Sequence, residues 1–354
     1  MIDLQVQRYG LLALVAAALF GASTPLAKQL LGEIGPITLA GLLYLGSGIG
    51  LLVLRAARRL RRAPQPAREA RLRRRDYPWL AGAVVCGGVI APVLLLTGLS
   101  GTSASTASLL LNFEGLLTAL LAAAAFREAV GGRIWWASAL MLAGGLVLSY
   151  EPGAGLGLSL NTLAIIGACL MWAIDNNLTR NISAADPGGI AMIKGLAAGL
   201  VNSALGQVAG EALPAWPLVA GAMALGLLSY GVSLVLYVRA LRHLGTARTA
   251  AHFGTAPFFG ALIAILLLGE PLSGVFLVSL VLMALAAWLA LSERHDHLHP
   301  HGHMVHSHRH IHDEHHRHAH TGNEGPEPHT HEHVHEPVVH AHPHLPDIHH
   351  RHGH

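Results

Sequence analysis

Charged side chains are scarce in this sequence, and lysine and cysteine are scarcer still. Asp, Glu, Lys and Arg together make up 12% of the 354 residues, against about 25% in soluble globular domains. Lys28 and Lys194 are the two lysines, so arginine carries almost all of the basic charge. This composition excludes an ordinary soluble domain, and the formal net charge of +3 matters less than where the charges lie.

Several catalytic patterns are missing as well. The sequence contains no Gly-Lys dipeptide, so no phosphate-binding P-loop for nucleotide hydrolysis can be drawn. Cys86 and Cys169 stand alone in apolar stretches, which argues against a disulfide framework or a cysteine-based zinc site. The apolar stretches also lack a paired nucleophile and base and a His-Glu-x-x-His pattern. We therefore expect no enzyme activity and no catalytic residue.

Long apolar stretches dominate the first 292 residues. A helix of about twenty apolar residues crosses the roughly 30 Å of hydrocarbon in a bilayer. The sequence predicts an all-α integral membrane protein with ten transmembrane helices, and the first stretch, which lacks a basic leader and a cleavage site, is expected to be retained. The expected spans are 9–31, 35–54, 78–98, 103–126, 134–150, 159–179, 187–208, 215–238, 249–269 and 272–292.

Arginines alternate between the loops and predict the orientation. Loops rich in Arg or Lys stay on the cytoplasmic side of a membrane. The loop after the second stretch holds ten arginines between Arg55 and Arg75, whereas the loops after stretches three, five, seven and nine hold no Arg or Lys. We expect a multi-pass protein of a bacterial-type inner membrane with both termini in the cytosol. Topology and anionic lipid explain the arginine run without any nucleic-acid partner.

The two halves of the apolar region carry matching sequence features. Residues 122–128 and 266–270 each close an apolar stretch with a glutamate, and residues 20–28 resemble residues 172–180. This predicts two repeats, 9–150 and 159–292. Because five crossings are an odd number, the second repeat would be inverted relative to the first. Inverted repeats of this kind place a solute site near the bilayer midplane between the halves.

These features resemble the EamA-type family of the drug/metabolite transporter superfamily. The resemblance rests on Leu109 to Glu128, on Gly254 to Pro271 and on the two-repeat layout. It implies a ten-helix permease that moves small solutes by secondary-active transport, often outward, in a lipid bilayer. A homodimer is a separate expectation. The resemblance also implies a proline in the middle of the fourth and ninth helices; Pro257 retains it, whereas Gly115 replaces the first.

A few polar residues fall inside the apolar stretches, where each ionisable group costs about 2.5–3.5 kcal/mol on insertion scales. We expect a substrate or ion pathway to be lined by Glu114, Asp175, Asn112, Asn176, Asn177 and Lys194. Carboxylates with amide oxygens suit a cation or a coupling proton. The alternative is a structural ion pair of Lys194 with Glu114 or Asp175.

Histidine is concentrated at the C-terminal end, where 24 of the 26 histidines fall in residues 295–354. Residues 293–354 are polar and proline-rich, so we expect a disordered cytosolic tail. Neutral imidazoles suit nickel, zinc, cobalt and copper. Alternating histidines are the expected metal ligands, namely His295, His297, His299, His301, His303, His329, His331, His333 and His335.

The sequence leaves three functions open. The favoured one is an exporter of small solutes, with a transition-metal cation or metal complex as substrate, because membrane carboxylates and a metal-binding tail occur together. The second is an exporter of amino acids or other metabolites whose tail senses metal. The third is a membrane-anchored metal buffer. None of these requires a cofactor for the transport step itself.

Overall fold

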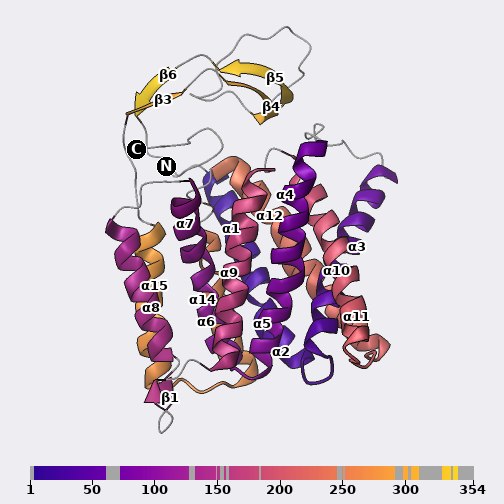
Figure 1. Ribbon diagram of the computed structural model, residues 1–354, viewed down its shortest axis with the longest axis vertical. Helices are drawn as coiled ribbons and strands as arrows, with labels where there is room; N and C mark the ends of the chain where they lie inside the picture. Colours follow the sequence, from indigo (N-terminus) through magenta and orange to yellow (C-terminus); the bar gives the residue numbers. More distant parts are fainter. Residues whose placement is uncertain are drawn as a thin grey trace.

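The computed structural model describes the helical bundle and four segments of the tail (Figure 1). The described residues are 4–60, 72–126, 132–148, 150–151, 155–156, 159–182, 185–244, 249, 252–291, 298–301, 304–310, 329–335 and 338–341. Helices run roughly parallel to one another, and strands β3 to β6 lie beyond one end of the bundle.

Helices account for almost all of the described residues before 292. In chain order they are α1 (Leu4–Gly21), α2 (Ser23–Leu30), α3 (Pro36–Leu60), the 3-10 helix η1 (Arg74–Asp76), α4 (Tyr77–Ala83), the π-helix η2 (Val84–Ile90), α5 (Ala91–Ser100), α6 (Ala104–Leu110), α7 (Asn112–Phe126), α8 (Gly132–Leu148), α9 (Leu160–Arg180), α10 (Pro187–Val208), α11 (Trp216–Gly226), the π-helix η3 (Leu227–Val232), α12 (Ser233–Leu244), α14 (Ala256–Leu268) and α15 (Gly274–Leu291). A hairpin of two short strands, β1 (Tyr150–Glu151) and β2 (Gly155–Leu156), follows α8.

Six helical segments among the described residues are long and apolar enough to cross a membrane. They are Gln7–Leu30, Pro36–Ala57, Arg74–Ser100, Ala104–Leu121, Gly188–Val208 and Trp216–Ala240, and Trp135–Leu148, Ala256–Leu268 and Gly274–Leu289 are shorter apolar helices. These segments confirm a multi-pass membrane protein. The total of ten crossings and the orientation of the termini stay predictions.

Several of the predicted stretches are interrupted within their length. The first breaks at Ala22 between α1 and α2, and the fourth breaks at Leu111 between α6 and α7. Pro257 lies in the first turn of α14 and not in mid-helix, because the helix begins at Ala256. A proline is tolerated there, since a first-turn N–H needs no helical partner.

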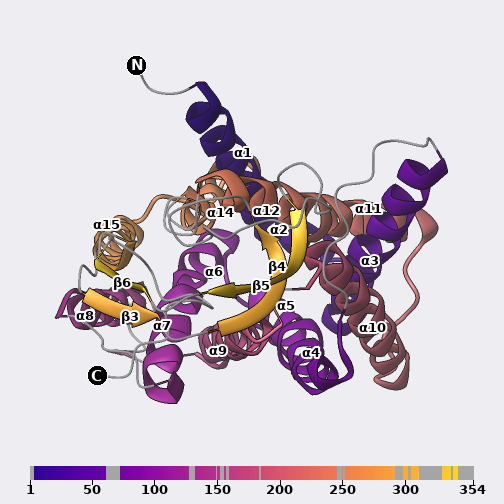
Figure 2. The same ribbon diagram turned by 90° about the horizontal axis from the view of Figure 1, so that it is seen from above.

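Helices before residue 150 pack against helices after residue 159. The most extensive pairs are α3 with α10, α8 with α15, α5 with α9 and α1 with α12, followed by α3 with α11, α7 with α9 and α6 with α14. Viewed along the helices, α8 and α15 form one edge of the bundle, and α3, α10 and α11 lie toward the opposite side (Figure 2). The two parts of the chain are thus interleaved rather than side by side.

Small residues allow a close contact between α3 and α10. A Cβ added at Gly195 would lie 2.8 Å from the backbone nitrogen of Gly48, and one added at Gly48 would lie 2.6 Å from the backbone nitrogen of Leu196. Close backbone approach of this kind supplies association energy in lipid, where burial of apolar side chains gains little.

Two glutamates at one end of the bundle cap helices far away in the sequence. Glu270 accepts hydrogen bonds from the backbone nitrogens of Ala104 (2.6 Å) and Ser105 (2.8 Å) at the start of α6. Glu211 accepts from Ile37 (3.1 Å) and Thr38 (2.6 Å) at the start of α3. The first-turn N–H groups of these helices, which lack helical partners, are satisfied in this way.

Four short strands are described in the tail. Strand β3 (Leu298–His301) pairs antiparallel with β6 (Val338–Ala341), and β4 (Met304–His310) pairs antiparallel with β5 (His329–His335). The alternation of histidine with other residues matches the two-residue period of a strand. The disorder expected for the tail as a whole stays a prediction. His295, His297 and His303 lie outside the described residues.

The α3–α10 contact generates a prediction about stability. Gly48→Val should destabilise the protein by about 1–3 kcal/mol, because its side chain meets backbone atoms. Gly115→Val is the matched control, since a Cβ at Gly115 meets nothing within 4 Å. Unfolding in detergent, followed by circular dichroism during titration with sodium dodecyl sulfate, measures both variants; equal midpoints would contradict the close contact.

Candidate functional site

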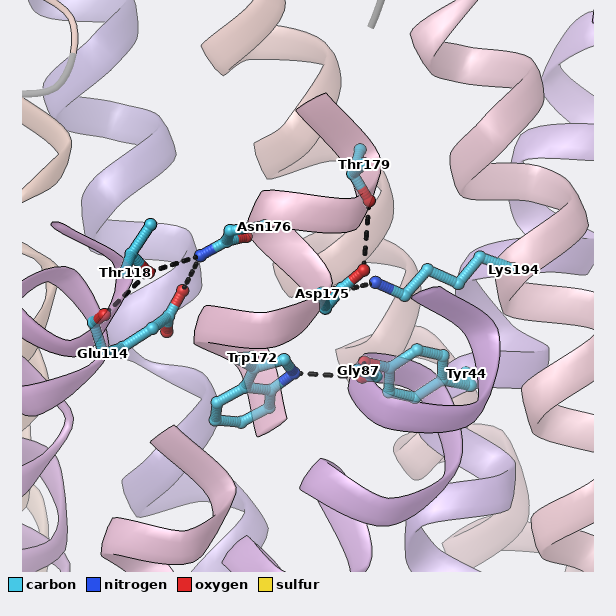
Figure 3. A network of polar contacts seen from close by, with 9 residues as sticks. All are labelled: Tyr44, Gly87, Glu114, Thr118, Trp172, Asp175, Asn176, Thr179 and Lys194. Atoms are coloured by element: carbon cyan, nitrogen blue, oxygen red, sulfur yellow. Dashed lines mark hydrogen bonds and ion pairs between the residues drawn. The ribbon is translucent and has the colours of Figure 1, made fainter. Parts of the chain in front are cut away.

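A buried ion pair lies where α9 meets α10. Lys194 of α10 donates to Asp175 Oδ2, and Thr179 Oγ1 donates to Asp175 Oδ1 at 3.1 Å (Figure 3). The Asp175 side chain is 5% exposed and that of Lys194 is 18% exposed. The two formal charges therefore compensate each other at a place where neither would be stable alone.

Glu114 lies across α9 from this pair and has neutral partners. Asn176 Nδ2 donates to Glu114 Oε1 at 3.0 Å and to Thr118 Oγ1 at 3.2 Å. Thr118 Oγ1 in turn donates to the backbone oxygen of Glu114 at 2.7 Å. Asn176 is exposed and Glu114 half-buried, and Gly115 next to it faces open space. The Glu114 residue is therefore only partly covered by the protein.

The π-helix η2 supplies a backbone carbonyl at the same level. Tyr44 of α3 donates its hydroxyl to Gly87 O at 2.6 Å, and Trp172 of α9 donates Nε1 to the same oxygen at 3.0 Å. In a π-helix the hydrogen-bond pattern shifts by one residue, and such segments occur often at functional sites. Gly87 is also required sterically, because an added Cβ would overlap the Asp175 carboxylate.

Five aromatic side chains form a row that begins at Tyr44, and we call this row the aromatic arc. It runs Tyr44, Tyr230, Phe20, Phe253, Tyr237, with successive ring centroids 5.6, 5.8, 5.4 and 4.9 Å apart. These spacings are typical of favourable ring contacts. Tyr44 is buried and the other four residues are half-buried, and Tyr230 packs against the hydrophobic core.

One contact joins the aromatic arc to the polar network. Tyr44, at one end of the arc, donates its hydroxyl to Gly87 O, the same oxygen that accepts from Trp172 Nε1. The network itself contains two carboxyl groups, Glu114 and Asp175, and the ammonium group of Lys194, which bonds Asp175 (Figure 3).

The sequence-predicted residues have different places in this network. Glu114, Asp175, Asn176 and Lys194 lie in it (Figure 3). Asn177 Nδ2 donates to Thr118 O at 3.2 Å and so joins α9 to α7, whereas Asn112 Nδ2 donates to Leu109 O of the preceding helical turn. Lys194 bonds Asp175 rather than Glu114, which resolves the alternatives that the sequence left open for its partner.

Several members of the network carry no signal in the sequence. Tyr44, Trp172 and Gly87 look like ordinary apolar-stretch residues, and the aromatic arc draws on α1, α3, η3, α12 and the turn before α14. The pattern aromatic, small, polar pair shared by residues 20–28 and 172–180 was the nearest hint, since it contains both Phe20 and Trp172.

Metal ligands are not clustered in the part of the chain that the structure describes. There, no group of three or more His, Cys, Asp or Glu side chains could hold a metal ion. In the tail, strand pairing sets His306 opposite His333, His308 opposite His331 and His310 opposite His329. His299 of β3 likewise stands opposite His340 of β6, and His301 stands opposite Val338.

Comparison with known proteins adds family information to this geometry. Residues 7–150 and residues 160–292 each match the model of the EamA-like transporter family. A protein of Methanothermobacter thermautotrophicus, described as an uncharacterised transporter, is 30% identical over 282 residues, which cover 75% of this chain and 81% of that protein. A protein of known crystal structure aligns with a TM-score of 0.57 at 19% identity, over 80% of this chain and 96% of its own, and supports the fold.

The Asp175–Lys194 pair generates a prediction about stability. Lys194→Met should cost about 3–5 kcal/mol, because it leaves a buried carboxylate without a counter-charge. The double variant Asp175→Asn with Lys194→Met should recover most of that loss. A double-mutant cycle on unfolding midpoints in detergent measures the coupling, and additive effects would show that the two groups do not form a pair.

Proposed function

Because the chain belongs to the EamA-like transporter family, we propose that it is a secondary-active transporter whose solute passes between Glu114 and the aromatic arc. The family assignment makes it a membrane transporter of small solutes. The observation that carries the pathway is the half-buried Glu114 carboxylate beside an ion pair, since ionisable groups inside a membrane mark solute or ion routes.

Alternating access between two inverted repeats is the proposed mechanism. In inverted-repeat transporters the solute site lies at the interface of the halves, which rock against each other. Three observations support it: the two separate family matches, the pairing of helices across the two halves, and the π-helices. These lie in the third apolar segment of each half, η2 between α4 and α5 and η3 between α11 and α12.

Tyr44 connects these two π-helices directly. Its hydroxyl bonds Gly87 of η2, and its ring stacks on Tyr230 of η3 at 5.6 Å. A π-helix has a weaker local hydrogen-bond ladder than an α-helix, so it is a place where a helix can bend. We propose that η2 and η3 are the hinges of the two halves.

Export from an inner-membrane location is the proposed direction. The arginine-rich segment from Arg55 to Arg75 supports a cytosolic placement of that loop and of both termini. The absence of a P-loop pattern from the sequence supports coupling to an ion gradient rather than to nucleotide hydrolysis.

The geometry favours an organic metabolite over a bare metal ion as the transported solute. The sequence made a transition metal the first choice, but bound metals need several ligands with suitable geometry. The described residues hold no such cluster in the bundle. We therefore assign metal binding to the tail, and the tail would sense metal and regulate transport.

Strand register supports metal binding by the tail. Residues directly opposite in an antiparallel ladder have Cβ atoms about 4.5–5.5 Å apart. Three histidine pairs stand opposite one another between β4 and β5, two residues apart along each strand. Imidazoles at such spacing suit nickel, zinc, cobalt or copper.

The transport proposal predicts the effect of neutralising the membrane carboxylates. Glu114→Gln and Asp175→Asn should each lower solute exchange in proteoliposomes by roughly tenfold or more, since a lost charge-assisted contact costs about 1.4 kcal/mol or more. Glu33→Gln, at an exposed turn, is the matched control. Unchanged exchange in both membrane variants, at normal insertion, would remove these carboxylates from the pathway.

The tail proposal predicts that register matters as well as composition. Exchanging His306 with Ser307 and His308 with Arg309 keeps all 26 histidines but moves two of them out of the paired positions. Nickel or zinc should then bind the full-length protein about tenfold more weakly, as expected when ligands are lost. Isothermal titration calorimetry measures this; an unchanged affinity would mean that the number of histidines alone matters.

A further inference from the structure

We infer that the start of α4 is a binding site for an anionic diacyl phospholipid, with the headgroup phosphate at Arg73, Arg74 and Arg75 and one acyl chain along the exposed face of α4. This inference goes beyond the transport function and depends only on the chain being a membrane protein. Three features of one short segment, residues 72–85, carry it. They are a basic turn, the two aromatic residues that follow it, and an exposed stripe that continues into the apolar helix.

The basic turn, Arg73 to Arg75, is fixed to the protein on both sides. Leu72, directly before it, packs against the apolar cluster around Leu80 and Ile190. Asp76, directly after it, accepts a hydrogen bond from the backbone nitrogen of Arg73 at 2.7 Å. The three arginines are therefore held together on a defined turn at the start of the helix.

The basic turn keeps most of its positive charge. All three arginines are exposed, the side chain of Arg75 by 76%. Asp76 Oδ1 lies 3.9 Å from Arg75 Nε, and among the residues that the structure describes Arg73 and Arg74 make no ion pair. Three positive groups and one negative group leave a formal charge of +2. Arginine binds phosphate oxygens through paired N–H donors, so this turn suits a phosphate group.

The turn lies where a membrane-spanning helix begins. The apolar segment that is long enough to cross the membrane is Arg74–Ser100, so the arginines stand at its first residues. Tyr77 and Trp79 follow directly and are 55% and 42% exposed. Exposed Tyr and Trp side chains gather at the level of the lipid headgroups. This position puts the basic turn at the depth of the phosphates of the same leaflet.

An exposed stripe leads from the basic turn into the apolar part of the helix. Residues three or four apart lie on one face of a helix, and Arg74, Tyr77, Ala81 and Val85 have this spacing. All four are exposed, Val85 by 50%. The stripe thus offers a charge, an aromatic ring and an apolar surface, in the order in which a phospholipid carries its phosphate, glycerol and acyl chain. A free phosphate ion would use the first of these alone, so the stripe favours a lipid.

Native mass spectrometry of the full-length protein in detergent measures lipid binding directly. The protein is incubated with equal amounts of phosphatidylglycerol and phosphatidylcholine that carry the same two acyl chains. Phosphatidylglycerol should be the first lipid bound, with a preference of about tenfold, because arginines near the membrane surface attract anionic lipid. Equal binding of the two lipids would overturn the inference.

Two triple variants and one control locate the preference. Replacing Arg73, Arg74 and Arg75 together by Gln should remove it, whereas replacing all three by Lys should keep at least half of it, because the charge remains. Arg8→Gln is the matched control and should change nothing. Arg8 is also exposed and also lies at the start of a spanning segment, Gln7–Leu30, but it has no arginine beside it.

The opposite results are equally clear. A preference that survives the triple Gln variant, or that Arg8→Gln removes, would overturn the inference, because the charge that selects the lipid would lie elsewhere. Equal loss in the Gln and Lys variants would overturn it as well, since charge would not be the selecting property.

Competition with glycerol phosphate separates the lipid from its headgroup chemistry. A tenfold excess of glycerol phosphate should leave the bound phosphatidylglycerol in place, because the competitor lacks the acyl chains that contact the stripe. Displacement would assign the basic turn to a free phosphate and overturn the lipid. None of these measurements involves transport, so the inference and the proposed function stand or fall separately.

Discussion

Backbone groups inside a bilayer must find hydrogen-bond partners within the protein, because the hydrocarbon offers none. The candidate site illustrates this constraint at the π-helix η2. The Gly87 carbonyl of η2 accepts hydrogen bonds from the Tyr44 hydroxyl and the Trp172 indole N–H. These two hydrogen bonds bring side chains of α3 and α9 to the same carbonyl oxygen, and the rest of the polar network lies around it.

Formal charge is distributed unevenly around this centre. Asp175 and Lys194 neutralise each other between α9 and α10, where both are largely buried. Glu114, by contrast, is half-buried and accepts from the neutral amide of Asn176. The ion pair links two helices, and Glu114 is the carboxyl group that we propose a solute meets.

Sequence reasoning predicted a multi-pass membrane protein, which the structure confirms, and singled out the charged residues of the polar network. Long apolar stretches have few alternatives to helices in lipid, and Glu114, Asp175 and Lys194 stood out because charges there are costly. It could not choose the partner of Lys194, since both carboxylates were within plausible reach along the chain. The structure chose Asp175, which lies on the adjacent helix.

Other parts of the site were beyond prediction for physical reasons. No residue pattern in 84–90 or 227–232 marks the π-helices, and their contacts with Tyr44 join residues that are far apart in the sequence. The aromatic arc joins rings from five separate segments, so its spacing is a property of packing. Asn112 had the right chemistry but bonds Leu109 O near its own helix break. In the tail, histidine at every second position matches the two-residue period of a strand, which the composition of the segment does not reveal.

Tyr44 belongs to two environments at once, with its hydroxyl on η2 and its ring on Tyr230 of η3. A solute that pushed this side chain aside would have to release the hydroxyl from one half of the molecule and disturb a stacked ring in the other. In the proposed alternating-access mechanism, a single phenol would then transmit occupancy of the site to both halves. Loss of Tyr44 would uncouple the movement of one half from that of its counterpart.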